Sequence, residues 1–359
     1  MNKEWSDSNK YNSFNSAKGL MYIREYEGFM SGKFLPPVEA LISPNGICNS
    51  NCIFCNSKKV LEEHHGKELE FKLLQKLIPE WIEWGVKGFC FSGDGEPTLY
   101  KGLKDLLLLI KKLGGISSII SNGMLISDEL KKVISDNTQW IGFSVDAATS
   151  KTYSHMKGVP EKILERTIKN ITDIANLKGQ TQVSMKFLIH PDNCHEIYQA
   201  CMLAKKMGVY DFHVRPVCTE GFYKVEHKTF TDEQLKDIDV QLQKCFAEET
   251  DNFRVYGCRH KFSPDLQVAN NFEKCWAAPL ILVTSPDGYV YFCIEMRGNP
   301  KYRLCKIEDI QKYWGSKEHV ELLKQVQPKK ECKSRCTMCA YNTQVEQCVI
   351  KDKMCRQFP

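Results

Sequence analysis

The stretch GICNSNCIFCNS, residues 46–57, places three cysteines at positions 48, 52 and 55, with no fourth cysteine beside them. Thiolates bind soft metals, and three of them at this spacing can hold one face of a cubic four-iron cluster. The fourth iron would then lack a protein ligand and could bind a small molecule. The alternative is a zinc site whose fourth ligand is a distant cysteine, His64 or His65.

On both sides of this stretch, from about residue 38 to residue 216, short β-branched runs alternate with longer amphipathic segments. Such alternation is typical of parallel strands connected by helices. A complete eight-stranded barrel usually takes about 250 residues, so we predict an α/β fold with a partial (β/α)6 barrel. Its six strands are expected at Val38 to Ile42, Gly88 to Ser92, Ser117 to Ser121, Trp140 to Val145, Val183 to Ile189 and Phe212 to Arg215.

The pattern changes after this region. Residues 229–249 predict one more helix, and the sequence beyond them is irregular and rich in cysteine. We therefore divide the chain into an N-terminal extension (1–37), the barrel (38–250) and a smaller cysteine-rich module (251–359). Within this module, LILVTSPDGYVYFC at 280–293 predicts a β-hairpin that turns at Pro-Asp-Gly.

Composition narrows the class of protein. The chain has no apolar run of about 18 residues and no apolar signal-peptide core, so we expect a cytosolic protein without a membrane span. In a reducing compartment, its 17 cysteines favour metal or redox chemistry over disulfides. The net charge of +5 comes from lysines mixed with carboxylates, which does not indicate a nucleic-acid surface.

Four segments together resemble the radical S-adenosylmethionine (radical SAM) superfamily. The first is the C-x3-C-x2-C loop with Phe54 before its last cysteine, which follows the first expected strand. FSGDGEPTL at 91–99, ISNG at 120–123 and GFSVDA at 142–147 follow at the expected ends of later strands. The order and spacing of all four make the likeness specific.

The resemblance implies roles for individual residues. The ligands of a [4Fe-4S] cluster would be Cys48, Cys52 and Cys55, and its open iron would chelate S-adenosylmethionine (SAM), whose cleavage yields a 5'-deoxyadenosyl radical. Residues near SAM would be Phe54, Gly95, Glu96, Pro97, Asn122, Ser144, Asp146 and Arg215. The Glu96 carboxylate and the backbone around it would bind the SAM amino group, whereas Ser144 and Asp146 can hydrogen-bond ribose hydroxyls. Asp94 departs from the family, which has a glycine at this position.

A second group of cysteines is similar to the SPASM and Twitch extensions of radical SAM enzymes, which hold auxiliary clusters. The spacing favours the Twitch form, with a single [4Fe-4S] cluster, because Cys348 and Cys355 depart from the SPASM pattern. Two ligands would be Cys275 and Cys293, and two more would come from Cys332, Cys336 and Cys339, with the choice among these three left open. A structural zinc ribbon on the same residues is the alternative.

We expect a radical SAM enzyme that oxidises or epimerises a small polar substrate such as a sugar, a cyclitol or an antibiotic precursor. Arg215 could hold a substrate anion, and Cys218 is a candidate hydrogen donor. A flavodoxin- or ferredoxin-type protein would supply electrons. Two alternatives are modification of a peptide or protein side chain, which the short segment before the first strand disfavours, and a non-catalytic iron-sulfur or zinc protein.

Overall fold

One continuous sheet organises the chain in the computed structural model, which describes residues 16–217, 230–257, 272–332, 336 and 338–346. The strand order is β10-β9-β8-β1-β2-β3-β4-β5-β6-β7. The strands are β1 (Glu39–Ile42), β2 (Gly88–Phe91), β3 (Ile116–Ser121), β4 (Trp140–Ser144), β5 (Gln182–Ile189), β6 (Asp211–Pro216), β7 (Arg254–Gly257), β8 (Ile281–Thr284), β9 (Tyr289–Tyr291) and β10 (Arg303–Lys306).

The α/β partial barrel is confirmed, and β1 to β6 correspond to the six expected strands. They pair in parallel and in sequence order. The structure adds β7, which pairs in parallel with β6, so the expected six-stranded count is one strand short. β7 (Arg254–Gly257) stands at the start of the segment that the sequence predicts to be irregular, so no strand was expected there.

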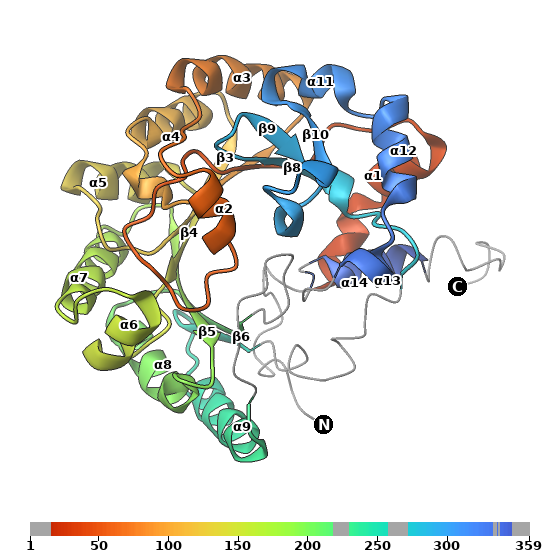
Figure 1. Cartoon of the computed structure of the whole chain (residues 1–359). Coiled ribbons are helices and arrows are strands. Elements are labelled where there is room, and N and C mark those ends of the chain that lie inside the picture. Colours follow the sequence, from red (N-terminus) through yellow and green to blue (C-terminus); the bar gives the residue numbers. More distant parts are fainter. Residues whose placement is uncertain (1–15, 218–229, 258–271, 333–335, 337, 347–359) are drawn as a thin grey trace.

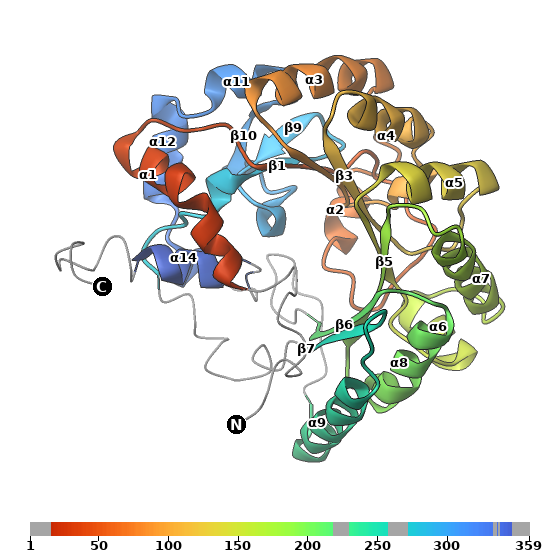
Figure 2. The same ribbon diagram turned by 180° about the vertical axis from the view of Figure 1, so that it is seen from behind.

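Helices cover the outer face of the curved sheet, as Figures 1 and 2 show from opposite sides. Each presents an apolar stripe to the strands; in α7, for example, Leu164, Ile171 and Ile174 are buried. These helices are α3 (Phe71–Trp84), α4 (Leu103–Lys112), α5 (Asp128–Asn137), α6 (Ser150–Lys157), α7 (Ile163–Asn176), α8 (Ile197–Lys206) and α9 (Asp232–Ala247). The short helix α2 (Lys58–Glu63) follows the cysteine loop and lies inside the arc of the sheet.

The expected hairpin is present and extends the barrel sheet. Strands β8 and β9 are antiparallel, and Gly288 supplies the positive φ of 83° that their turn requires. β8 also pairs in parallel with β1, so residues far apart in sequence lie side by side at this edge. Around it pack α1 (Ile23–Ser31), α11 (Ile310–Tyr313), α12 (Lys317–Gln325), α13 (Pro328–Glu331) and α14 (Cys339–Val345).

The register of the parallel strands brings their carboxyl ends to one mouth. Ile42 is opposite Phe91, and Ile119 to Ser121 are opposite Ile141 to Phe143. Loops that follow β1, β2, β3 and β4 therefore meet above the sheet, where barrels of this kind carry their chemistry. In the described part of the chain, no helix has the length and apolar character needed to cross a membrane.

Candidate active site

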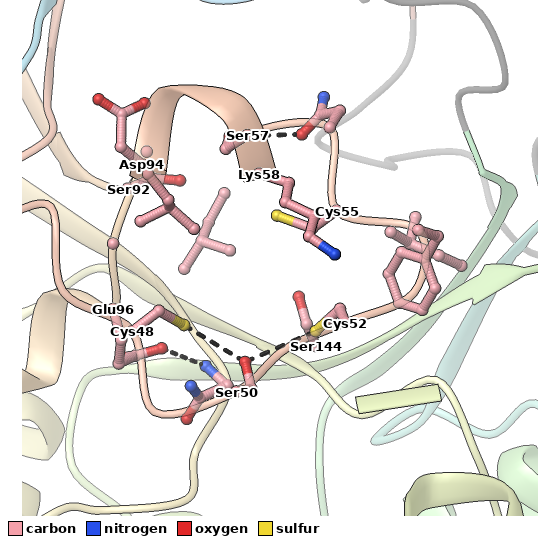
Figure 3. Close-up of a pocket in the computed structure, with 18 of the residues that line it drawn as sticks. Cys48, Ser50, Cys52, Cys55, Ser57, Lys58, Ser92, Asp94, Glu96 and Ser144 are labelled. Carbon is pink, nitrogen blue, oxygen red and sulfur yellow. Dashed lines mark hydrogen bonds between the residues drawn. The ribbon is translucent and has the colours of Figure 1, made fainter. Parts of the chain in front are cut away.

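A cavity of about 280 Å³ opens at this mouth of the barrel. Its walls come from the loop after β1, the turn after β2 and the ends of β3 to β6. The sulfur-bearing residues Cys48, Cys52 and Cys55 line it together, as Figure 3 shows. Of the other predicted site residues, the cavity is lined by Phe54, Gly95, Glu96, Asn122, Ser144 and Arg215.

Backbone hydrogen bonds hold the cysteine loop on the end of α6. Asn51 N–H donates to Lys157 O at 2.8 Å, and Ile53 N–H donates to Met156 O at 3.1 Å. Gly158 ends α6 at φ 62°, and a Cβ there would lie 2.5 Å from Asn51 O. A glycine is thus required where the helix end meets the loop.

The three thiols are mostly withdrawn from water. Ser50 Oγ lies 3.3 Å from Cys48 Sγ and 3.5 Å from Cys52 Sγ, so these two sulfur atoms flank one hydroxyl group. Burial raises the pKa of Cys48, and it raises the pKa of Cys55 to about 11. A nearby metal cation reverses this effect, because it stabilises thiolates.

This donor set fits a four-iron cluster with three protein ligands. Three soft thiols face one partly closed cavity, and the described residues that line it include no fourth cysteine. Among the described residues, no three His, Cys, Asp or Glu side chains are arranged to hold a single metal ion. A cubic cluster needs a wider arrangement, because each thiolate binds a different iron.

The turn after β2 packs closely against the cysteine loop. Gly95 N–H donates to Asn45 O at 3.0 Å, and Glu96 N–H donates to Ile47 O at 2.8 Å. A Cβ on Gly95 would lie 2.5 Å from both of these carbonyl oxygens, so a larger residue cannot fit. The cysteine loop and the GDGEP segment therefore form one unit. Pro97 begins a short 3-10 helix immediately behind it.

Glu96, whose carboxylate the resemblance gives to the SAM amino group, also accepts hydrogen bonds from residues of the chain. It is 3% exposed, and Oε1 accepts hydrogen bonds from Thr98 N–H (3.1 Å), Thr98 Oγ1 (2.8 Å) and Ser121 Oγ (2.7 Å). Oε2 accepts from Asn122 N–H at 2.7 Å. Burial raises the pKa of Glu96, while the bonds from Asn122 and Ser121 act against that shift. The carboxylate thus joins the ends of β2 and β3.

Two cavity residues keep polar groups at the mouth. Asn122 Nδ2 donates to Asn49 Oδ1 at 2.6 Å, which ties the end of β3 to the cysteine loop. Ser144, the last residue of β4, also lines the cavity and is labelled in Figure 3. A hydroxyl at this position can donate and accept hydrogen bonds with a bound ligand.

Asp146 does not line the cavity, although the sequence placed it near a ribose. It is fully buried, its backbone is left-handed (φ 62°), and its Oδ1 accepts from Leu188 N–H at 2.6 Å. Its other oxygen accepts from Lys157 Nζ. Burial opposes the Lys157 charge, but Asp146 and the neighbouring Cys52 outweigh it and raise the pKa of this lysine. Asp146 therefore serves to hold a buried cation.

Lys157 itself lines the cavity, and sequence reasoning missed it. Its ammonium lies 5.4 Å from the centre of the Phe54 ring, and Phe54 is buried against Met156 and Val217. The only sequence hint was a lysine beside the glycine that ends α6, which is a common arrangement. Glu295, from the segment after β9, also lines the cavity and had no sequence signal.

Arg215, near the end of β6, lines the cavity as well, so it remains a candidate for holding an anion. Cys218, the predicted hydrogen donor, lies outside the described residues, as do Cys348 and Cys355.

The second cysteine group lies near the β8–β9 hairpin. Cys275 is buried in a small apolar cluster, against which Cys293 and Cys332 pack. Asn342 Nδ2 approaches Cys275 Sγ at 3.6 Å. Burial raises the pKa of Cys293 well above its ordinary value and that of Cys332 to about 12, with neighbouring thiols adding to both shifts. Burial also raises the pKa of Cys336, and the nearby thiols of Cys275, Cys339 and Cys293 add to this shift. All five predicted cysteines therefore lie in one region.

Comparison with known proteins agrees with this geometry. Residues 42–204 match the family described as "Radical SAM superfamily". A "Probable GTP 3',8-cyclase" of Saccharolobus islandicus is 26% identical over 278 residues, which span 75% of this chain and 87% of that protein. Another protein of the same description, from Methanosarcina mazei, is 27% identical over 273 residues, which span 72% of this chain and 78% of that protein.

Solved structures share the fold. Streptococcus suis SuiB superposes with a TM-score of 0.66 at 18% identity, covering 93% of this chain and 79% of its own. SuiB bound to the precursor peptide SuiA gives 0.65. The enzyme anSMEcpe with bound AdoMet gives 0.59 at 18% identity, covering 86% of this chain and 88% of its own. At such identities the likeness establishes the fold alone.

Proposed function

This chain belongs to the radical SAM superfamily, and we propose that it binds SAM in the cavity at the barrel mouth and cleaves it reductively to a 5'-deoxyadenosyl radical. The observation that carries this proposal is that Cys48, Cys52 and Cys55 line the same cavity as the GDGEP turn. The [4Fe-4S] cluster that these cysteines would hold supplies, when bound, the electron for that cleavage.

The chain's own residues bind and orient the ligand. Glu96 holds the ends of β2 and β3 together, and Gly95, which lines the cavity beside it, can offer its backbone carbonyl to an ammonium group. Ser144 is suited to a ribose hydroxyl. Lys157 places a buried positive charge beside Cys52, and Arg215 offers a cation to a carboxylate of SAM or of the substrate.

The reaction that we favour is oxidation or epimerisation of a small polar substrate. The cavity walls carry hydroxyl, amide and charged groups, which suit a molecule with several polar substituents. Relatives described as probable GTP 3',8-cyclases, which act on a small polar molecule by that description, span three quarters of this chain. Modification of a peptide is the second candidate, because SuiB shares the fold and has been solved with a precursor peptide.

An auxiliary cluster would be held by Cys275, Cys293 and two of Cys332, Cys336 and Cys339. Support comes from the packing of Cys293 and Cys332 against the apolar cluster of Cys275 and from the mutual electrostatic influence of these thiols. Such a cluster would accept the electron left on a substrate radical. We assign it to the expected module at 251–359, in the part that follows β7, because β7 itself pairs with β6 of the barrel. A cytosolic setting with a flavodoxin- or ferredoxin-type reductant suits two reduced iron-sulfur sites.

Replacing Cys48, Cys52 and Cys55 together by Ala tests the proposal. The variant should lose one four-iron cluster and all release of 5'-deoxyadenosine in anaerobic assays with SAM and dithionite. Release of 5'-deoxyadenosine by the triple variant would disprove the assignment. Metal analysis of the unmodified chain separates the zinc alternative, since about eight irons are expected for two cubic clusters and one or two zincs would contradict them.

The two substrate classes separate by mass spectrometry after incubation with SAM and dithionite. Loss of two mass units from a sugar or nucleotide, or deuterium uptake from heavy water, supports the small-molecule reaction. The same change on a peptide, with small molecules left unaltered, supports the alternative.

A further inference from the structure

Asp94, which stands where the family has a glycine, is almost fully buried in the turn after β2. Its N–H donates to Ser43 Oγ at 2.8 Å. Asp94 lines the cavity, and Figure 3 shows its carboxylate pointing away from the three cysteines. Both carboxylate oxygens instead meet residues from the C-terminal part of the chain.

The first of these residues is Arg297. Its Nε lies 2.9 Å from Asp94 Oδ1, in an ion pair that lacks the alignment of a hydrogen bond. Its Nη2 donates to Ser57 Oγ at 3.1 Å, across 240 positions of sequence. Arg297 is 7% exposed, so both contacts are made away from water. One guanidinium group therefore joins the turn after β2 to the end of the cysteine loop.

The second residue is Ser285, directly after β8. Its Oγ donates to Asp94 Oδ2 at 2.7 Å and lies 3.2 Å from His64 Nδ1. His64 also lies 3.6 Å from an oxygen of Asp287 in the hairpin turn. Burial opposes ionisation of Asp94, but Arg297, with His64 and Ser285, outweighs it and lowers the pKa of this carboxyl.

The three segments joined at Asp94 all border the cavity. Ser57 follows the ligand candidate Cys55 by two residues, and Asp94 precedes Gly95 and Glu96. Arg297 follows the cavity residue Glu295 by two and the auxiliary candidate Cys293 by four. A buried ion pair contributes little to the free energy of unfolding, because desolvation of the two charges offsets most of their attraction. A pair that fixes three cavity walls relative to one another has a specific use.

We propose that Asp94 and Arg297 are positioning residues, whose buried ion pair sets the GDGEP turn and the cysteine loop against the C-terminal segment and so completes the SAM cavity. The inference rests on the proposed SAM-binding function. It follows that the C-terminal cysteine-rich part contributes to SAM binding as well as to the chemistry of the substrate.

The test uses iron-loaded full-length protein and measures the SAM dissociation constant by anaerobic equilibrium dialysis. A second readout is the change that SAM causes in the electron paramagnetic resonance spectrum of the reduced protein. Arg297→Gln should weaken SAM binding about tenfold at unchanged iron content, since it removes a charged, bridging contact. Arg297→Lys should give an intermediate value, because a single ammonium keeps the charge but cannot span Asp94 and Ser57.

Arg303→Gln is the matched control. Arg303 pairs with Asp287 at 3.5 Å and stacks on Tyr289, but it is half-exposed and does not contact the cysteine loop. Its SAM affinity should stay within twofold of the unmodified protein. If Arg297→Gln fails to fold, the double variant Asp94→Asn with Arg297→Gln decides, because it leaves no unpaired buried charge. We expect it to fold and to bind SAM about tenfold more weakly.

Equal SAM affinity in the folded Arg297 variants and the unmodified protein would overturn the inference while leaving the proposed function intact. So would a loss of affinity that only follows the fraction of unfolded chain. If the unmodified protein itself binds no SAM, the proposed function fails, and the inference fails with it.

Discussion

Replacing Glu96 by Gln tests how the GDGEP turn works. The carboxylate accepts four hydrogen bonds, from two groups of Thr98 and from Ser121 and Asn122. Gln has one oxygen and one NH2 group in the same space, so at least one buried donor will face another donor. A hydrogen bond to a charged group contributes about 1.5–3 kcal/mol, and an unsatisfied buried donor costs about 1–3 kcal/mol.

We therefore expect Glu96→Gln to lower the free energy of unfolding by about 2–4 kcal/mol. SAM affinity should fall as well, because the ends of β2 and β3 lose their connection. The measurements are thermal or urea unfolding and equilibrium binding of SAM to the iron-loaded protein. Glu129→Gln is the control, since Glu129 is exposed in its ion pair with Lys104 and should change stability by less than about 1 kcal/mol.

One outcome would refute this reasoning. If Glu96→Gln left stability within about 0.5 kcal/mol of the unmodified protein and still abolished SAM binding, the carboxylate would contact the SAM ammonium directly. The four hydrogen bonds would then be incidental to the role of the residue.

Three further predictions follow from the structure. Cys275→Ala should reduce iron to about one cubic cluster and abolish substrate turnover while SAM cleavage persists per folded chain; two full clusters in this variant would make Cys275 a core thiol. Lys157→Met should leave Asp146 buried without its cation and lower stability by about 3–5 kcal/mol, measured by urea unfolding, and unchanged stability would contradict the pairing. His319 is 2% exposed and burial lowers its pKa from 6.5 to about 4, so it folds neutral and the unfolded chain binds the extra proton. Stability should therefore fall by up to about 3 kcal/mol as pH drops from 6.5 to 4, and His319→Phe should flatten unfolding curves across that window, with His155→Phe, at an exposed position, as the control that does not.

Much of the barrel was readable from the sequence, because strand and helix periods are local properties. Each of the six strands from β1 to β6 overlaps one of the expected strands, and the hairpin is marked by Pro-Asp-Gly, where Gly288 adopts a positive φ. The cysteine spacing likewise gathers three thiols within one loop, since Cys55 follows Cys48 by only seven positions. β7 was not predicted because its four residues stand in a segment without a repeating pattern, and each of them follows its partner in β6 by 43 positions.

The sequence by itself thus determined which side chains carry the chemistry: three thiols in one loop and a turn of glycines and a carboxylate after the next strand. Only the tertiary structure decided what each of them touches. Glu96 and Asp146 are expected from the sequence to contact a ligand, and the fold also gives both of them partners within the chain, Asn122 and Lys157 among them. Arg297 meets Asp94 and Ser57 only because β8 pairs with β1. Such pairings between distant segments depend on how the sheet closes in space, and no local period encodes them.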